Sequence, residues 1–245
     1  MRSLVRIFLA AAFIASAGFA IAKPHPAVII NASEIVDRHL SGFNAINVAG
    51  PFDVDIIQGA TESVKVEAPA DVMEHILTEV NGGVLKIYSK HDLWNWGNWF
   101  GHHKKILVHV TAKALNEINI SGSGDVAFRE GITANSLKLR ISGSGDMSGK
   151  VTVKTLESSI SGSGDMRLSG RADNSTASVV GSGDFRAGSL LTESTAVRVS
   201  GSGDADINAS EKVDAAVNGS GDVHYSGGPK SVNKHKSGSG DISGH

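Results

Sequence analysis

The side chains best placed to do chemistry are seven aspartates, each of which closes a copy of the sequence Gly-Ser-Gly-Asp. They are Asp125, Asp146, Asp165, Asp184, Asp204, Asp222 and Asp241. Successive copies are 18 to 21 residues apart. A short unit that recurs at a nearly constant period is typical of a solenoid, in which each unit packs on its neighbours. Stacked units would place the seven carboxylates in one column.

Neighbouring carboxylates in such a column would lie about 4.8 Å apart and would repel each other by about 1 kcal/mol in water. Backbone N–H groups of the turns can offset this repulsion by hydrogen bonding, while the glycines provide backbone angles that other residues avoid. A row of calcium ions is the alternative, although one carboxylate per turn is few for an ion that prefers six to eight oxygens. We therefore expect structural turns without a metal or other cofactor. Identical aspartates also provide no separate acid and base for catalysis.

A second candidate site lies at residues 93–105, between two expected strands. Its aromatic side chains are Trp94, Trp96, Trp99 and Phe100. Exposed aromatics beside histidine and lysine can contact a glycan, a partner protein or a lipid interface. Packing of the same rings on the side of the solenoid is the alternative. His91, His102 and His103 could bind zinc or copper, but they lack the paired spacing of a dedicated site.

The absence of several catalytic and binding motifs, together with the overall composition, argues against several classes of function. The sequence has no Gly-x-Ser-x-Gly elbow, phosphate-binding loop, dinucleotide fingerprint or His-Glu-x-x-His helix, so we expect no enzyme activity. The net charge is −2, which gives no electrostatic footprint for nucleic acid. The chain has no cysteine, so core burial and backbone pairing must stabilise it without disulfides.

The first 22 residues have the pattern of a secretory signal peptide. Arg2 and Arg6 precede an apolar run at residues 4–17, and Ala20-Ile21-Ala22 is a typical cleavage sequence. We expect cleavage before Lys23 and an exported protein in the periplasm, at the cell surface or in the medium. No second apolar run follows, so the mature chain is expected to lack a transmembrane span.

The elements that must position these side chains differ between the two halves of the mature chain. Residues 23–42 are expected to form a tether, and residues 43–117 an irregular β part with the tryptophan-rich hairpin. Asp53 takes the place of the repeat aspartate in a cryptic first rung. Pro69 and apolar residues four apart predict a short helix at residues 69–80. Residues 118–245 form the regular repeats.

The repeats align on their aspartates, with apolar residues at fixed positions on both sides. Five residues before the aspartate stand Ile120, Ile141, Ile160, Val179, Val199 and Val217. Apolar positions in steps of two predict two short strands per turn with these side chains inward. The fold class expected is all-β, a right-handed parallel β-solenoid with turns of about 19 residues. Lys234 and Lys236 fall at inward positions of the last turn, which would protect that end from association.

The sequence at residues 43–48, Phe52-Asp53-Val54, the strand at residues 84–88 and the Gly-Ser-Gly-Asp series together carry a family resemblance. On these motifs the chain resembles the DUF2807 family, also called putative autotransporter adhesin head-GIN domain proteins. The resemblance implies an exported, β-helix-like protein of the envelope or cell surface with no assigned activity. We expect a non-enzymatic scaffold whose partner is a glycan or a surface protein, and the sequence leaves a homo-oligomer open. A calcium-stabilised repeat protein and a polysaccharide-acting enzyme are the alternatives.

Overall fold

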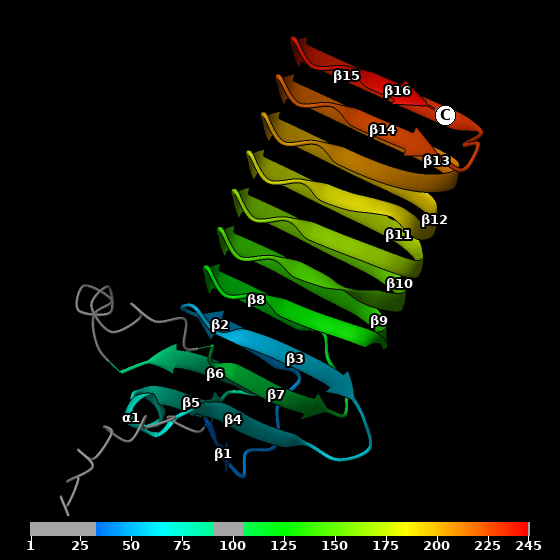
Figure 1. Ribbon diagram of the computed structural model, residues 1–245. Helices are drawn as coiled ribbons and strands as arrows, with labels where there is room; N and C mark the ends of the chain where they lie inside the picture. Colours follow the sequence, from blue (N-terminus) through cyan, green and yellow to red (C-terminus); the bar gives the residue numbers. More distant parts are fainter. Residues whose placement is uncertain (1–32, 91–104, 245) are drawn as a thin grey trace, which may run out of the picture. The chain divides into compact units, whose positions relative to one another are not determined.

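The structure is a computed structural model that describes residues 33–90 and 105–244. Strands make up 73% of the described residues and helix 2%. The strands form a stack of parallel coils, about seven turns of about 19 residues each (Figure 1). The predicted all-β solenoid is therefore confirmed.

The regular part of the stack consists of strands that pair in parallel with the coil before and the coil after. They are β8 (Glu117–Gly122), β9 (Val126–Gly143), β10 (Met147–Gly162), β11 (Met166–Gly181), β12 (Phe185–Gly201), β13 (Ala205–Gly219), β14 (Val223–Ser226), β15 (Ser231–Gly238) and β16 (Ile242–Gly244). Ile160 of β10 lies opposite Ile141 of β9 on one side and Val179 of β11 on the other. The repeat of the sequence is thus also the register of the sheet.

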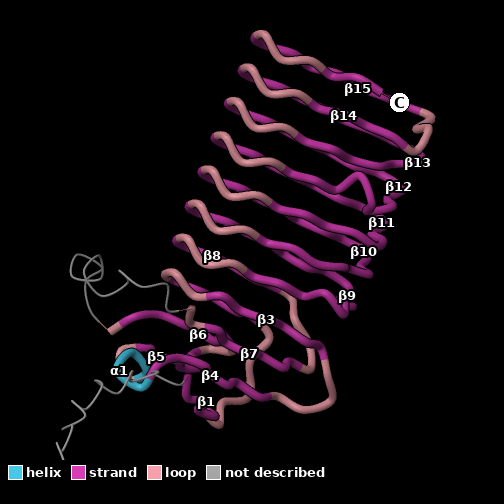
Figure 2. Tube along the Cα trace, viewed as in Figure 1, coloured by secondary structure: helices cyan, strands magenta, loops and turns pink. Residues whose placement is uncertain are grey.

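Each complete coil contains one long strand, whereas the sequence predicted two short ones. β9 has 18 residues and β13 has 15. Gly131 and Gly170 lie inside strands with φ of 102° and 105°, which lets the chain turn a corner while it keeps its pairing. The Gly-Ser-Gly-Asp turns are the main interruptions, and Figure 2 shows them as loops at one end of each coil.

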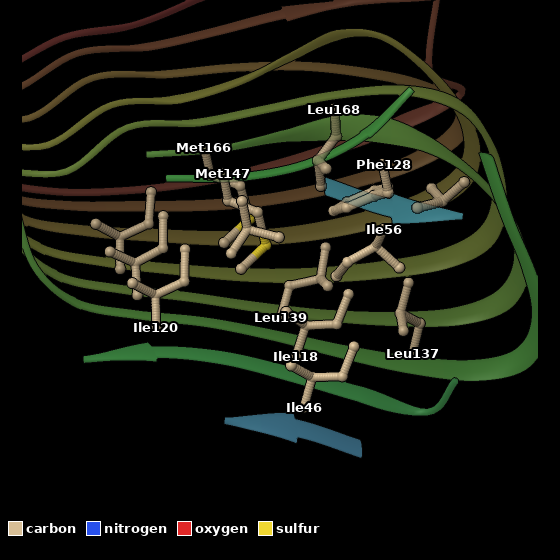
Figure 3. Close-up of a cluster of buried hydrophobic side chains, with 14 of the residues drawn as sticks. Ile46, Ile56, Ile118, Ile120, Phe128, Leu137, Leu139, Met147, Met166 and Leu168 are labelled. Atoms are coloured by element: carbon tan, nitrogen blue, oxygen red, sulfur yellow. The ribbon is translucent and has the colours of Figure 1, made fainter. Parts of the chain in front are cut away.

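Inward side chains of successive coils form columns through the middle of the stack. Figure 3 shows Ile46, Ile118 and Leu139 one above another, and all three are fully buried. The position five residues before each aspartate is buried from Ile120 to Val217, as the sequence predicted. The sequence analysis missed a further buried column nine residues before the aspartate, which holds Leu137, Leu156, Ser175, Thr195 and Val213. Ser175 and Thr195 interrupt the apolar pattern of this column, so the sequence did not reveal it.

The cryptic rung around Asp53 forms a coil beneath the regular ones. It consists of β2 (Ala45–Ala49) and β3 (Asp53–Gln58). β2 pairs in parallel with β8, where Ile46 lies opposite Ile118, and β3 pairs in parallel with β9, where Val54 lies opposite Val126. The column of turns therefore extends one coil further toward the N-terminus than the exact motif does.

Below this coil, shorter strands extend each side of the stack. β7 (Leu107–Ala112), β4 (Ser63–Pro69) and β1 (Ser33–Asp37) follow β3, and β6 (Val84–Ser89) and β5 (Ile76–Asn81) follow β2. β1, β4 and β5 run antiparallel to their neighbours. β1 falls within residues 23–42, so part of the predicted tether is paired in the sheet.

The helix predicted at residues 69–80 is wrong beyond its first turn. Helix α1 covers only Ala70–Met73, after Pro69 at its N-cap, and β5 begins at Ile76. In β5, Val80 lies opposite Leu85 in an antiparallel hairpin that turns at two glycines with positive φ. Pairing with β6 thus overrides the four-residue apolar spacing that favoured a helix.

Candidate functional site

The turn aspartates form a hydrogen-bonded column along one edge of the stack. The Oδ1 atom of each aspartate accepts a hydrogen bond from the backbone N–H of the aspartate in the next coil. The N···Oδ1 distances are 2.7 to 3.0 Å from Asp125 through Asp241. The bond from Asp125 N–H to Asp53 in the cryptic rung is 3.4 Å long. Bonds to an ionised acceptor are stronger than neutral ones, so the column ties each turn to the next.

Backbone hydrogen bonds flank this column on both sides. Ser144 N–H donates to the carbonyl of Gly122 at 2.9 Å, and Met147 N–H donates to the carbonyl of Asp165 at 2.9 Å. Equivalent bonds recur from turn to turn. The turns are therefore stacked as closely as the strands.

Both glycines of each turn are needed, and the first is needed for two reasons. It has a positive φ, for example 134° at Gly143 and 129° at Gly162, and a Cβ atom at either position would lie 2.2 Å from a carbonyl oxygen of the preceding turn. The second glycine has no positive φ. A Cβ atom on Gly164 would lie 2.0 Å from the carbonyl oxygen of Gly145 in the preceding turn. The second glycine is thus required by the close approach of stacked backbones.

Basic side chains neutralise parts of the carboxylate column. Arg186 donates from Nη1 to Oδ2 of Asp165 at 2.8 Å and from Nη2 to Oδ2 of Asp184 at 2.7 Å. Asp165 first, and then Asp184, raise the pKa of the Arg186 guanidinium above its usual value. The nearest charges at the two ends are more distant, with Lys105 3.9 Å from Asp53 and Lys236 3.7 Å from Asp241. These partly exposed ion pairs offset part of the electrostatic repulsion between neighbouring aspartates.

The arrangement does not resemble a metal centre. Within the described residues, no three His, Cys, Asp or Glu side chains are grouped so that they could hold a metal ion. Each coil contributes one carboxylate, and its Oδ1 is already an acceptor for a backbone N–H. Calcium would have to use the remaining oxygens of carboxylates on separate coils.

A sequence model of the DUF2807 family, described as "Putative auto-transporter adhesin, head GIN domain", matches residues 42–229. The chain belongs to the DUF2807 family. The match begins just before β2 and includes six of the seven exact Gly-Ser-Gly-Asp turns. No curated protein matches the sequence.

Several solved structures have the same fold as this DUF2807 protein. A "putative adhesin" from Bacteroides fragilis is 26% identical, with a TM-score of 0.79 over 87% of this chain and 97% of its own. A "putative lipid binding protein" from Parabacteroides distasonis is 24% identical, with a TM-score of 0.69 over 88% and 98%. A "putative adhesin" from the same species is 23% identical, with a TM-score of 0.68 over 88% and 98%. The family and these neighbours carry the names of adhesins and a lipid-binding protein.

Several of the predicted sites lie outside the described residues. They are the contact residues Trp94, Trp96, Trp99 and Phe100, the histidines His91, His102 and His103, and the signal peptide at residues 1–22. The structure describes the strands that flank the tryptophan-rich segment, β6 and β7. In the described part of this DUF2807 chain, no helix is long and apolar enough to cross a membrane.

Sequence reasoning missed the hollow surface beside the aspartate column. A hollow of about 780 Å³ lies near the cryptic rung, where Asp53, Asp55, Glu67 and Lys105 are among the residues that line it. A groove of about 700 Å³ crosses the coils that follow. The groove is lined mainly, and the hollow in part, by outward residues two and four positions after the aspartates, whereas the repeat pattern in the sequence marks the inward positions.

Proposed function

We propose that this DUF2807 protein is an exported, non-catalytic scaffold of the cell envelope or surface that acts as an adhesin by contact with a ligand. The observation that carries the proposal is the in-register stack, whose turns are joined through the backbone and through the aspartate column. Such a stack presents its outward side chains at fixed intervals on a rigid surface. The likeness to the Bacteroides fragilis protein supports the same conclusion.

Contact rather than catalysis is supported by the uniformity of the turns. The aspartates from Asp125 to Asp222 share one partner, a backbone N–H of the next coil. Asp165 and Asp184 differ from the others only by their additional bonds to Arg186. General acid–base catalysis needs groups whose surroundings differ, so that one holds a proton while the other accepts one. The predicted export signal and the family description support a location outside the cytoplasm.

The proposed contact region is the tryptophan-rich segment between β6 and β7, and this part of the proposal rests on the sequence. Trp96→Ala combined with Trp99→Ala is expected to remove the binding to a glycan, surface protein or membrane that this segment provides, while the melting temperature stays within about 2 °C, because rings used for contact with a ligand add little to the core. Glycan-array and lipid-overlay binding together with thermal unfolding would measure both effects.

The matched control removes apolar surface from the solenoid itself. Val180→Ala combined with Leu191→Ala truncates two side chains that are 51% and 56% exposed, so binding should stay at the level of the parent. A marked fall in the melting temperature of the tryptophan variant alone would show that the rings belong to the core, and would contradict their role as a contact surface.

A further inference from the structure

The groove beside the aspartate column is built from similar positions of successive coils. It is lined by residues of six successive strands, from β9 to β14, and encloses about 700 Å³. With neighbouring strands about 4.8 Å apart, it is about 24 Å long. Small residues leave space on this face of the stack. They are Ser148, Gly149, Ser169, Gly188 and Ser189. The groove therefore runs along the stack, across the strands, with a length suited to a linear polymer.

One half of the groove is basic. Its cations come one from each of four successive strands and are Arg129, Lys150, Arg167 and Arg186. Arg186 is occupied by Asp165 and Asp184. The first three are exposed, and their charged groups make no ion pair with any described residue. Because the whole chain has a net charge of −2, this group of unpaired cations is a local feature that an anionic ligand would complement.

The other end of the groove carries an aromatic side chain. Tyr225 lines the groove at β14, whereas Leu168 and Ile207, which also line it, are buried in the core. Tyr225 is half-buried, and the Nζ atom of Lys234 lies 4.8 Å from the centre of its ring. His224 lies beside it, 3.7 Å from Asp206. The Tyr225 ring can pack against the C–H face of a sugar.

We propose that this groove binds a linear anionic polysaccharide that lies along the stack. Carboxylates or sulfates of the polymer contact Arg129, Lys150 and Arg167, since guanidinium groups bind such oxyanions in pairs of hydrogen bonds. A sugar ring packs on Tyr225. Cations on successive coils match an anion that repeats along a chain, whereas a protein partner would need a broader contact surface. The groove is a second contact region besides the tryptophan-rich segment, and the proposal rests on the adhesin-like function.

Titration calorimetry of the mature protein with polygalacturonate and with heparin tests the groove and separates carboxylate from sulfate ligands. The variant Arg129→Gln, Lys150→Gln, Arg167→Gln should bind at least about tenfold more weakly, with a shallower dependence on salt, because exposed charge pairs are screened by ions. The control variant Lys154→Gln, Arg198→Gln, Lys212→Gln removes the same charge from exposed sites outside the groove, and it should bind within about twofold of the parent.

Chain length and competing polymers complete the test. Affinity for oligogalacturonates should rise with length until the oligomer spans the six strands, and then stay constant. Equal weakening by the two triple variants, or equal binding of dextran or single-stranded DNA by the parent, would overturn the proposal.

The failure of the groove and the failure of the adhesin-like function are distinguishable. If the parent adheres to cells but the groove variant still binds the polymers as the parent does, the groove proposal is wrong and the adhesin-like function stands. If polymer binding depends on the groove but neither protein adheres to any surface, the adhesin-like function is wrong. Release of short oligosaccharides by the parent would contradict a non-catalytic scaffold.

Discussion

Gly164→Ala is expected to destabilise the solenoid by at least about 3 kcal/mol, or to prevent its folding. The added methyl group would lie 2.0 Å from the carbonyl oxygen of Gly145, which is backbone of the preceding turn. That oxygen cannot move away without breaking the hydrogen bonds that join neighbouring turns. Urea unfolding followed by circular dichroism would measure the change in free energy.

Gly188→Ala is the matched control for this substitution. Gly188 lies in β12 with an ordinary φ, and an added Cβ would have no neighbour closer than 3.9 Å. Alanine should therefore be neutral or stabilise the protein by up to about 1 kcal/mol, because glycine loses more chain entropy on folding. If both variants were as stable as the parent, the turns could not approach each other as closely as the structure has them.

The second large effect is expected in the aspartate column. The combined change Asp146→Ala, Asp204→Ala, Asp222→Ala should cost about 3 kcal/mol, because each alanine removes the acceptor of a backbone N–H in the next coil. The same three positions changed to asparagine keep an oxygen acceptor and lose the like charges. That variant should stay within about 1 kcal/mol of the parent. Thermal and urea unfolding would compare the three proteins.

The asparagine variant also separates hydrogen bonding from calcium binding. If the column acts through hydrogen bonds, EDTA should leave the melting temperature of the parent unchanged. A calcium-stabilised stack would instead lose stability on EDTA treatment, and it would lose about as much with asparagine as with alanine, because a neutral amide is a weaker ligand for calcium than a carboxylate.

The regular half of the fold could be predicted because each coil repeats the same local pattern. Ile141, Ile160 and Val179 occupy equivalent sequence positions and equivalent places in the sheet. The column at Ser175 and Thr195 was missed because a buried hydroxyl breaks the apolar pattern. Thr195 bonds to Thr192 at 2.7 Å, which makes its burial tolerable.

The N-terminal half was harder to predict because its pairing is not repeated. Ile76 begins a strand rather than continuing a helix, since its partner β6 is supplied by the segment that follows the turn at Gly82 and Gly83. No local pattern in residues 69–80 contains that information. The same limit applies to β1, whose partner β4 begins 26 residues after β1 ends.

The candidate sites were predictable to different degrees. The sequence indicated that backbone N–H groups would bind the turn aspartates, but not that each N–H would come from the next aspartate. Arg186 lies between Asp165 and Asp184 only because the coils are stacked in register. The groove has the same origin, since Arg129, Lys150 and Arg167 come together across strands and form no sequence motif.

Engineered disulfides test the in-register stack most directly, because the chain has no cysteine of its own. Ser142 and Ser161 are exposed and lie opposite each other on neighbouring strands, whereas Val180 lies one coil further. Ser142→Cys with Ser161→Cys should form a disulfide in the folded protein under mild oxidation, since neighbouring strands bring the Cα atoms about 5 Å apart. Ser142→Cys with Val180→Cys should not, because about 10 Å separates them. A disulfide in the second variant and not in the first would contradict the stack.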